Sequence, residues 1–173
     1  MTEKTPGALL TIDDDAVVSG LARLVAASVD LRAPLANIGQ VVRQSTIDRF
    51  AREVSPAGVP WAPLNPEYRA GKKGPGILRE NRRLSDIVWQ LGGNAVQVGS
   101  SVVYARVHQF GAVILPKTAA ALVFSLGGRI VHAMRVIIPA RPFLGLSAED
   151  LIEITAILDD HFIAGTGGAA ERV

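Results

Sequence analysis

The stretch SPAGVPWAPLNPEYRAGKKGPGILRENRRL, residues 55–84, separates two parts of the chain that differ in sequence pattern. Its five prolines and four glycines exclude a long helix or a central strand over residues 55–80. A segment of this length without regular structure is usually functional or partly disordered. We therefore expect residues 55–80 to form a long extended arm rich in Pro and Gly.

Helical periodicity dominates the residues before this segment. Residues 11–30 predict a helix capped by Thr11 or by an aspartate, and residues 34–54 predict a second helix with Pro34 at its first position. Arg43, Arg49 and Arg52 are expected on the polar side of the second helix. The predicted apolar faces consist of Val17, Leu21, Leu24, Val25 and Val29 in the first helix and Leu35, Ile38, Val42 and Phe50 in the second.

Two glycine pairs indicate β-hairpins after residue 84. Gly92-Gly93-Asn94 and Gly127-Gly128 each separate two apolar runs, which is the pattern of a hairpin turn. The second hairpin is predicted over residues 120–139. Residues 101–111 predict a short helix that stops at Gly111. Residues 147–165 predict a last helix, in which Ser147 and Asp150 form a weak capping box. Its expected buried side chains are Leu151, Ile154, Ile157 or Leu158, and Phe162.

The order of these elements favours an α+β fold, because strands occur as hairpins and do not alternate with helices. We expect an antiparallel sheet of two β-hairpins packed against about three to four helices, with the long extended arm beside them. The predicted organisation is a flexible leader at residues 1–11, a single domain at residues 12–163 and a flexible tail at residues 164–173.

Composition excludes several functional classes. The chain has no cysteine, which excludes disulfides, thiolate nucleophiles and zinc–thiolate sites. Its net charge of +2 is far below that of a strongly basic nucleic-acid binder. No long apolar run follows a basic start, and no apolar run is long enough to span a bilayer. We therefore expect neither a signal peptide nor a membrane contact.

No motif for catalysis or cofactor binding stands out. The basic loop AGKKGPG, residues 70–76, lacks the preceding strand and the Ser or Thr that a phosphate-binding P-loop requires. His108, His132 and His161 lie on different predicted elements, and no G-x-S-x-G elbow is present. We expect no catalytic, cofactor or metal site, and hence no enzyme. A hydrolase stays as a third alternative, which requires a cleft with convergent polar groups.

Two sets of residues are candidates for binding a partner. Trp61 is a large aromatic side chain that either folds back on its own domain or is buried in a partner, and Phe143 lies in a segment stiffened by prolines. We expect contacts with partners or other copies from Trp61, Leu64, Tyr68, Arg141 and Phe143. A positive stripe that faces DNA or an acidic partner is expected from Lys72, Lys73, Arg79, Arg82 and Arg83.

Four short motifs follow one another within residues 45–162. They are S-P-x-G-x-x-W-x-P-L at 55–64, the pairs Ile77-Leu78 and Arg83-Leu84, Y-A-x-x-H-Q-F-G at 104–111, and R-P-F-L-G-L at 141–146. In this order and spacing they resemble the phage virion morphogenesis family, which includes the tail completion proteins of P2-like phages and the G protein of Mu-like phages.

The resemblance implies a structural protein without catalysis, a tail completion or neck component at the head–tail junction of the virion. It implies assembly in the bacterial host cytoplasm as a homo-oligomeric ring, with a hexamer favoured, and contacts with connector or neck proteins and with tail-tube or tail-terminator subunits. A domain with an arm that crosses to its neighbour suits such a ring. The alternative is a module that binds DNA irrespective of sequence through the basic stripe at residues 72–83.

Overall fold

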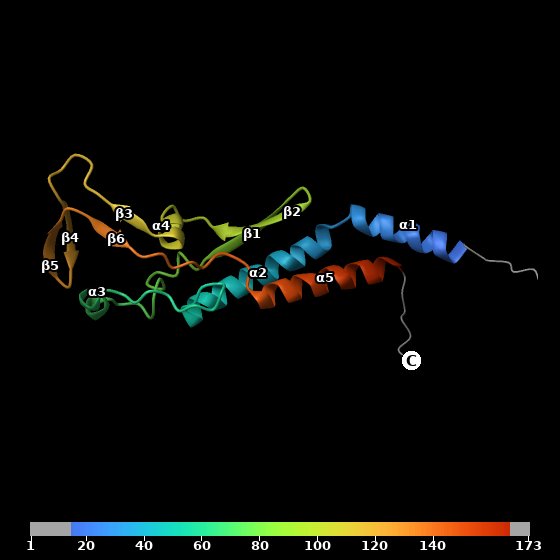
Figure 1. The fold of residues 1–173 in the computed structure, drawn as a ribbon, viewed down its shortest axis with the longest axis horizontal. Coiled ribbons are helices and arrows are strands. Elements are labelled where there is room, and N and C mark those ends of the chain that lie inside the picture. The colour runs from blue at the N-terminus through green and yellow to red at the C-terminus, as the bar shows by residue number, and fades with distance from the viewer. Residues whose placement is uncertain (1–14, 167–173) are drawn as a thin grey trace, which may run out of the picture.

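The computed structural model describes residues 15–166, which form the predicted α+β fold (Figure 1). The helices are α1 (Asp15–Val29), α2 (Arg32–Arg52), α3 (Pro66–Gly71), α4 (Ala105–Phe110) and α5 (Ala148–Thr166). The strands are β1 (Ile87–Gly92), β2 (Ala95–Ser100), β3 (Ala112–Ile114), β4 (Leu122–Leu126), β5 (Arg129–Ala133) and β6 (Val136–Ile138). Within these residues the strands form three separate two-stranded antiparallel sheets, β1–β2, β3–β6 and β4–β5, rather than one sheet.

The long helices make up one half of the molecule. α2 and α5 lie side by side, and α1 contacts α5 beyond the end of α2 (Figure 1). α5 begins with the predicted capping box: the Ser147 hydroxyl accepts from the Asp150 N–H at 3.1 Å, and the Asp150 carboxylate accepts from the Ser147 N–H at 2.7 Å. α2 begins earlier than predicted, at Arg32, so Pro34 occupies its third position instead of its first.

Arg49 corrects the prediction that it lies on the polar side of its helix. Its side chain is only 1% exposed and forms an ion pair with Asp150 at the start of α5. The same guanidinium donates to the carbonyls of Phe143, at 3.1 Å, and Gly145, at 2.7 Å, and to the Ser45 hydroxyl, at 3.0 Å. Because its donors meet this full set of acceptors, the buried charge is compensated. Arg49 thereby fastens α2 to α5 and to the preceding link.

The β1–β2 hairpin packs on α2. Its two-residue turn, Gly93-Asn94, lies where the sequence predicts a turn, with Gly92 paired to Ala95. Trp89 of β1 approaches the helix so closely that a Cβ on Gly39 would lie 2.7 Å from a carbon of the indole ring. The small residue in α2 is therefore what lets the hairpin lie against the helix.

The second hairpin is shorter than predicted. Gly127 and Gly128 form its turn with φ of +57° and +80°, a conformation that suits glycine. β5 ends at Ala133, and the following strand, β6, leaves the hairpin and pairs with β3 instead, Ala112 opposite Ile138. The β3–β6 pair was not predicted from the sequence, because its second strand lies within the predicted hairpin.

The core lies where α2, β1, residues 55–84 and the link after β6 meet. Its buried apolar side chains are Phe50, Trp61, Ile77, Leu84, Ile87 and Phe143. Residues 55–84 run from this core to α3, which lies beside β4 at the far end, and then return (Figure 1). There, an ion pair of 2.7 Å between Glu67 of α3 and Arg129 of β5 joins α3 to the β4–β5 hairpin. The predicted arm therefore packs on its own chain rather than extending from it.

Several predictions concern the ends of the chain. The leader at residues 1–11, the Thr11 cap and the last part of the predicted tail, from residue 167, lie outside the described residues. α5 continues to Thr166, past the predicted start of the tail at residue 164. Leu21 and Val25 of α1 and Leu151 of α5 belong to predicted apolar faces, but their side chains are exposed.

Candidate interaction groove

Trp61 lies in the aromatic core, folded back on its own domain. Its side chain is 5% exposed, and its Nε1–H donates to the Pro142 carbonyl at 2.8 Å. The Phe50 ring meets Trp61 edge-on, with ring centroids 5.4 Å apart, and lies 5.0 Å from the ring of Phe143, which is fully buried. Trp61 and Phe143 thus hold the 55–64 segment and the 140–147 link together. Their predicted contacts with a partner stay predictions.

Arg141 holds the next part of the same junction. Its Nε donates to the Ala62 carbonyl at 2.8 Å and its Nη2 to the Pro63 carbonyl at 3.0 Å, while its backbone N–H donates to the His108 carbonyl at 2.7 Å. Burial lowers the pKa of the Arg141 guanidinium. These bonds place Leu64 and α3 relative to α4.

Gln109 is a positioning residue that the sequence analysis did not single out. Its Oε1 accepts from the N–H groups of Phe143, at 2.9 Å, and Leu144, at 3.0 Å, and its Nε2 donates to the Leu144 carbonyl at 2.9 Å. The Y-A-x-x-H-Q-F-G motif therefore binds the backbone of the R-P-F-L-G-L motif. The occurrence of Gln109 inside a motif was the only signal in the sequence that could have pointed to it.

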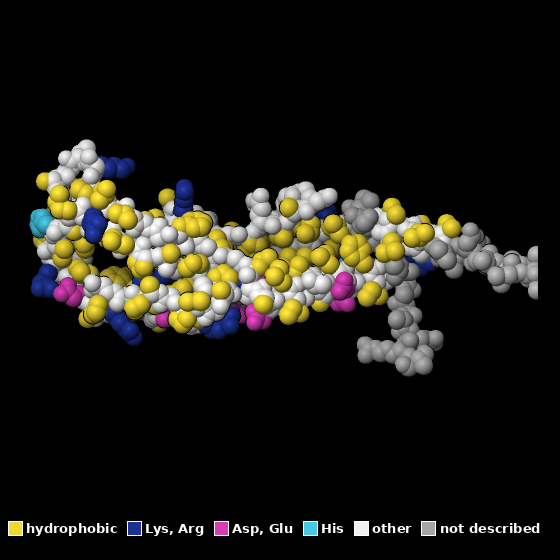
Figure 2. Space-filling view, in the orientation of Figure 1, with side chains coloured by type: hydrophobic (Ala, Val, Ile, Leu, Met, Phe, Trp, Pro, Cys, Tyr) yellow, Lys and Arg dark blue, Asp and Glu magenta, His cyan; other side chains and the backbone are white. Residues whose placement is uncertain are grey.

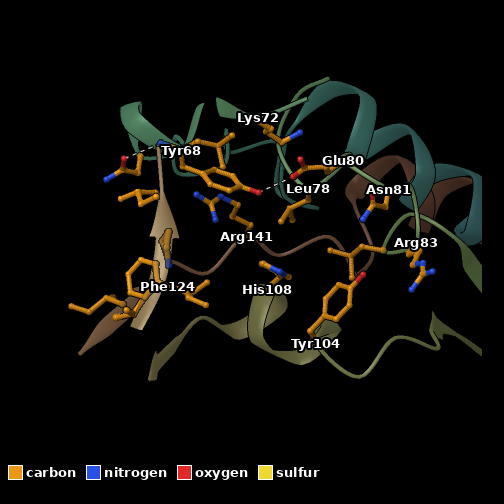
Figure 3. A pocket seen from close by; sticks show the side chains of 18 of the residues that line it. Tyr68, Lys72, Leu78, Glu80, Asn81, Arg83, Tyr104, His108, Phe124 and Arg141 are labelled. Atoms are coloured by element: carbon orange, nitrogen blue, oxygen red, sulfur yellow. Dashed lines mark hydrogen bonds between the residues drawn. The ribbon is translucent and has the colours of Figure 1, made fainter. Parts of the chain in front are cut away.

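A groove of about 620 Å³ opens between α3, the returning part of residues 55–84, α4 and the inner face of the β4–β5 hairpin (Figure 3). Figure 2 shows the molecule hollowed beside this hairpin. Its apolar walls come from Leu64, Leu78, Leu84, Phe124, Leu126, Val136 and Ile138. Its polar lining includes Tyr68, Lys72, Glu80, Asn81, Arg82, Arg83, His108 and Arg141.

Tyr68 and Glu80 meet across one side of the groove. The Asn65 side chain caps α3 by accepting from the N–H groups of Glu67, at 2.9 Å, and Tyr68, at 3.2 Å, which fixes the start of this short helix. The Tyr68 hydroxyl then donates to a Glu80 carboxylate oxygen at 2.8 Å. This hydrogen bond, together with burial and the Glu80 charge, raises the pKa of Tyr68.

His108 lies at the bottom of the groove between Tyr104 and Arg141 (Figure 3). Burial lowers the pKa of the imidazole, and the nearby charge of Arg141 lowers it further. Its Nδ1 is buried without a hydrogen-bond partner within residues 15–166. The groove therefore contains a neutral histidine at neutral pH. Its charged lining consists of the carboxylate of Glu80 and the cations Lys72, Arg82, Arg83 and Arg141.

The predicted site residues divide between the groove and other places. The groove brings together Leu64, Tyr68, Lys72, Arg82, Arg83 and Arg141. Lys73 and Arg79 do not line it, and the Lys72 ammonium donates to the Gly74 carbonyl at 2.8 Å. The five basic residues thus do not form one continuous stripe along the groove, and whether any of them contacts DNA stays a prediction.

The part of the chain that the structure describes contains neither a candidate metal cluster nor a candidate membrane span. Over residues 15–166, histidine and acidic side chains nowhere gather in a group of three or more that could bind a metal ion. No helix in this range is both long enough and apolar enough to cross a membrane.

Known proteins similar to this chain come from prophages. The chain is 27% identical over 147 residues to the Mu-like prophage FluMu G protein 2 of Haemophilus influenzae, covering 84% of this chain and 88% of that protein. It is 26% identical over 153 residues to the FluMu G protein 1 of the same organism, covering 84% and 89%. No solved structure matches it. A family comparison matches residues 12–163, nearly the whole chain, and the chain therefore belongs to the phage virion morphogenesis family.

Proposed function

We propose that the chain is a non-enzymatic structural component of the head–tail junction, a tail completion or neck protein that forms a ring and joins the tail to the head. The observation that carries this proposal is that the end of the molecule with β3–β6 and β4–β5 has unpaired strand edges and exposed apolar side chains. Within the described residues each of these strands pairs with a single neighbour, and Val113, Val123, Ile130 and Ile137 expose most of their side chains there.

Such a surface is unfavourable in a monomeric protein, because it lowers stability and promotes aggregation. A two-stranded sheet is marginally stable in water, and its free edges are templates for pairing with other chains. Exposed apolar patches of this kind mark protein–protein contacts. Neighbouring subunits that cover β3–β6 and β4–β5 would remove both liabilities, which is the behaviour expected of an assembly component.

Unlike surfaces at the two ends of the molecule support a ring, since contacts between unlike surfaces close into rings when the rotation permits. Family membership supports a role in building the virion. We favour six copies by resemblance, assembled in the bacterial host cytoplasm and retained in the virion. The expected partners are connector or neck proteins on the head side and tail-tube or tail-terminator subunits on the tail side.

The test is loss and restoration of the gene in a phage that encodes this chain. We expect its deletion to yield DNA-filled heads and complete tails that stay unjoined in electron micrographs, and the wild-type gene supplied in trans to restore joined particles. The double variant Val123→Ser with Ile130→Ser should fold but fail to restore them. Val88→Ser, at an exposed position on the outer face of β1, is the matched control. Normal joined particles after deletion would refute the proposal.

The second candidate, a module that binds DNA irrespective of sequence, is supported by the charge of residues 65–141. They carry eleven Lys and Arg against three Asp and Glu, and Lys73, Arg82 and Arg83 are exposed. Contacts with phosphates alone predict binding that weakens steeply with salt. Fluorescence anisotropy with a short duplex measures this, and the absence of binding at low salt would eliminate the candidate.

A further inference from the structure

Two parts of the folded molecule, residues 65–141 and α5, carry opposite net charge. Residues 65–141, which form most of the groove, have the excess of Lys and Arg described above. In contrast, α5 has four exposed acidic residues besides the buried Asp150, and neither Lys nor Arg. Figure 2 shows mostly dark blue charged side chains around the end with β4 and β5, with magenta among them, and magenta ones along α5. One part of the surface is therefore complementary in charge to another part of the same chain.

α5 also presents an apolar stripe among these acids. Ile152, which is 72% exposed, shares one side of the helix with Ala156, Asp159 and Ile163, because these positions are three or four residues apart. Asp160 lies beside the stripe, and it is exposed like Asp159. An amphipathic helix that offers spaced apolar anchors is the usual ligand of an apolar groove. We call these five residues the α5 stripe.

The groove has the matching properties. Its walls are apolar, with Leu64 and Phe124 among them. The exposed cations Arg82 and Arg83 lie on its lining, where the one carboxylate, that of Glu80, already accepts from Tyr68. DNA phosphates would satisfy the cations but not the apolar walls, whereas the α5 stripe satisfies both. Charge pairs at such an interface set orientation and partner choice.

A chain cannot fill its own groove with its own α5. The helix lies in the other half of the molecule from α3 and the β4–β5 hairpin (Figure 1). The buried Arg49–Asp150 pair and the capping box also hold its first turn against α2. An α5 helix in the groove must therefore come from another copy.

We infer that the groove of one copy receives the α5 stripe of the next copy, head to tail. Groove and stripe are different surfaces, so the contact is heterologous and each copy keeps one groove and one stripe for its two neighbours. The inference rests on the proposed function, and it adds the surfaces through which the copies meet. The acidic residues of the α5 stripe set the orientation of the contact, and its apolar residues pack into the groove.

Cysteine cross-linking tests this contact directly, because the chain contains no cysteine of its own. Asn81→Cys puts a thiol on the groove, and Ala156→Cys puts one on the α5 stripe. We expect a mixture of the two full-length variants, under mild oxidation at low salt, to give several-fold more disulfide-linked dimer than either variant alone. Thr118→Cys, exposed in the loop before β4, replaces Asn81→Cys in the control mixture, which should show no such increase.

Charge reversal distinguishes this contact from other uses of the groove. Arg82→Glu with Arg83→Glu in the groove variant, or Asp159→Lys with Asp160→Lys in the stripe variant, should each abolish the gain in dimer, and the two together should restore it. Asp86→Lys is the control for the α5 changes: combined with Arg82→Glu and Arg83→Glu, it should not restore the gain in dimer. Cross-linking only within the Asn81→Cys variant would reveal a symmetric dimer and overturn the inference. DNA binding by the groove without mixed cross-linking would overturn it in favour of DNA.

Virions distinguish this inference from the proposed function. A chain that carries both Asn81→Cys and Ala156→Cys should give a ladder of covalent oligomers in particles purified from a phage that encodes it. If the chain is present in the particles but neither the particles nor the mixed variants cross-link, the contact is wrong while the proposed function stands. If the mixed variants cross-link but the chain is absent from the particles, the contact stands and the proposed function fails.

Discussion

At the scale of single residues, a few buried polar groups join segments that are distant in the sequence. Arg49 and Asp150 are separated by 101 positions, and Trp61 and Pro142 by 81. Each group has partners within the chain, so removing one leaves the other buried without compensation. These residues therefore stabilise the fold.

Replacement of Asp150 by Asn tests the buried ion pair. We expect the variant to lose about 3–5 kcal/mol of unfolding free energy at neutral pH, because the Arg49 charge stays buried without its counter-ion. Urea denaturation followed by circular dichroism measures the loss. Glu153→Gln is the control, since the same change at an exposed position of α5 removes no buried partner. Equal stability of the two variants would contradict the assignment.

The same carboxyl predicts how stability depends on pH. Burial raises the pKa of Asp150, but hydrogen bonds from Ser147 and Ser45 and the charge of Arg49 outweigh it and lower the pKa overall. The unfolded chain therefore binds the proton more readily, and the stabilisation is complete above about pH 4 and is lost as pH falls through the folded-state pKa. Urea midpoints measured from neutral pH downwards should fall more steeply for the wild type than for Asp150→Asn. Parallel curves would exclude this contribution.

We expect substitution of Trp61 to lower the free energy of unfolding. Trp61→Ala should cost about 3–5 kcal/mol, as do other large-to-small changes in a core. Trp61→Phe retains a ring and loses mainly the bond to Pro142, which is a cost of about 1 kcal/mol. Thermal and urea unfolding of both variants measure this order. Tyr68→Ala, at an exposed position, serves as control, and a Trp61→Ala variant as stable as Tyr68→Ala would place the indole outside the core.

The sequence could predict that Trp61 is an anchor but not which surface it occupies. A proline-rich context and a lone tryptophan are compatible with a partner or with the chain itself, and the choice depends on Pro142 and Phe143. The burial of Arg49 could not be predicted for the same reason. Helical periodicity assigns an arginine to the polar side, and its burial depends on a distant counter-ion, Asp150. Asp150 was predicted correctly as a cap because Ser147 is only three positions away.

At the scale of elements, close packing between α2 and the β1–β2 hairpin depends on one small residue. The Cβ atom of any residue at position 39 would overlap the indole of Trp89 and come within 2.9 Å of Val96. Gly39→Ala should therefore destabilise the protein by about 1–3 kcal/mol through overpacking. Gly20→Ala in α1 meets nothing within 4 Å and should stabilise its helix instead. Urea unfolding compares them, and stabilisation by both would refute the close contact.

Elements defined by local chemistry were predicted well, and those defined by distant pairing were not. The turns at Gly93-Asn94 and Gly127-Gly128 follow from the residues at the turn, as does the capping of α5. The β3–β6 pair needs strands on both sides of the second hairpin to meet, and no local pattern encodes that meeting. The groove was missed as a site for the same reason, since α3, α4 and the β4–β5 hairpin build it together.

At the scale of the whole molecule, the core lies between two unlike parts. One part is helical and carries the acidic α5, and the other bears the open sheets, the groove and most of the cations. Arg49 and the aromatic cluster connect the parts, so the groove and α5 lie in different halves of the molecule. A subunit that meets two neighbours through different surfaces is suited to a closed ring.

A cryo-electron microscopy map of the head–tail junction in virions that encode this chain tests the central claim most directly. We expect a closed ring of copies between connector and tail, with α1, α2 and α5 resolved in each copy and α5 of one copy against the groove of the next. A resolved junction without density for this fold would contradict the proposal that the chain joins head and tail.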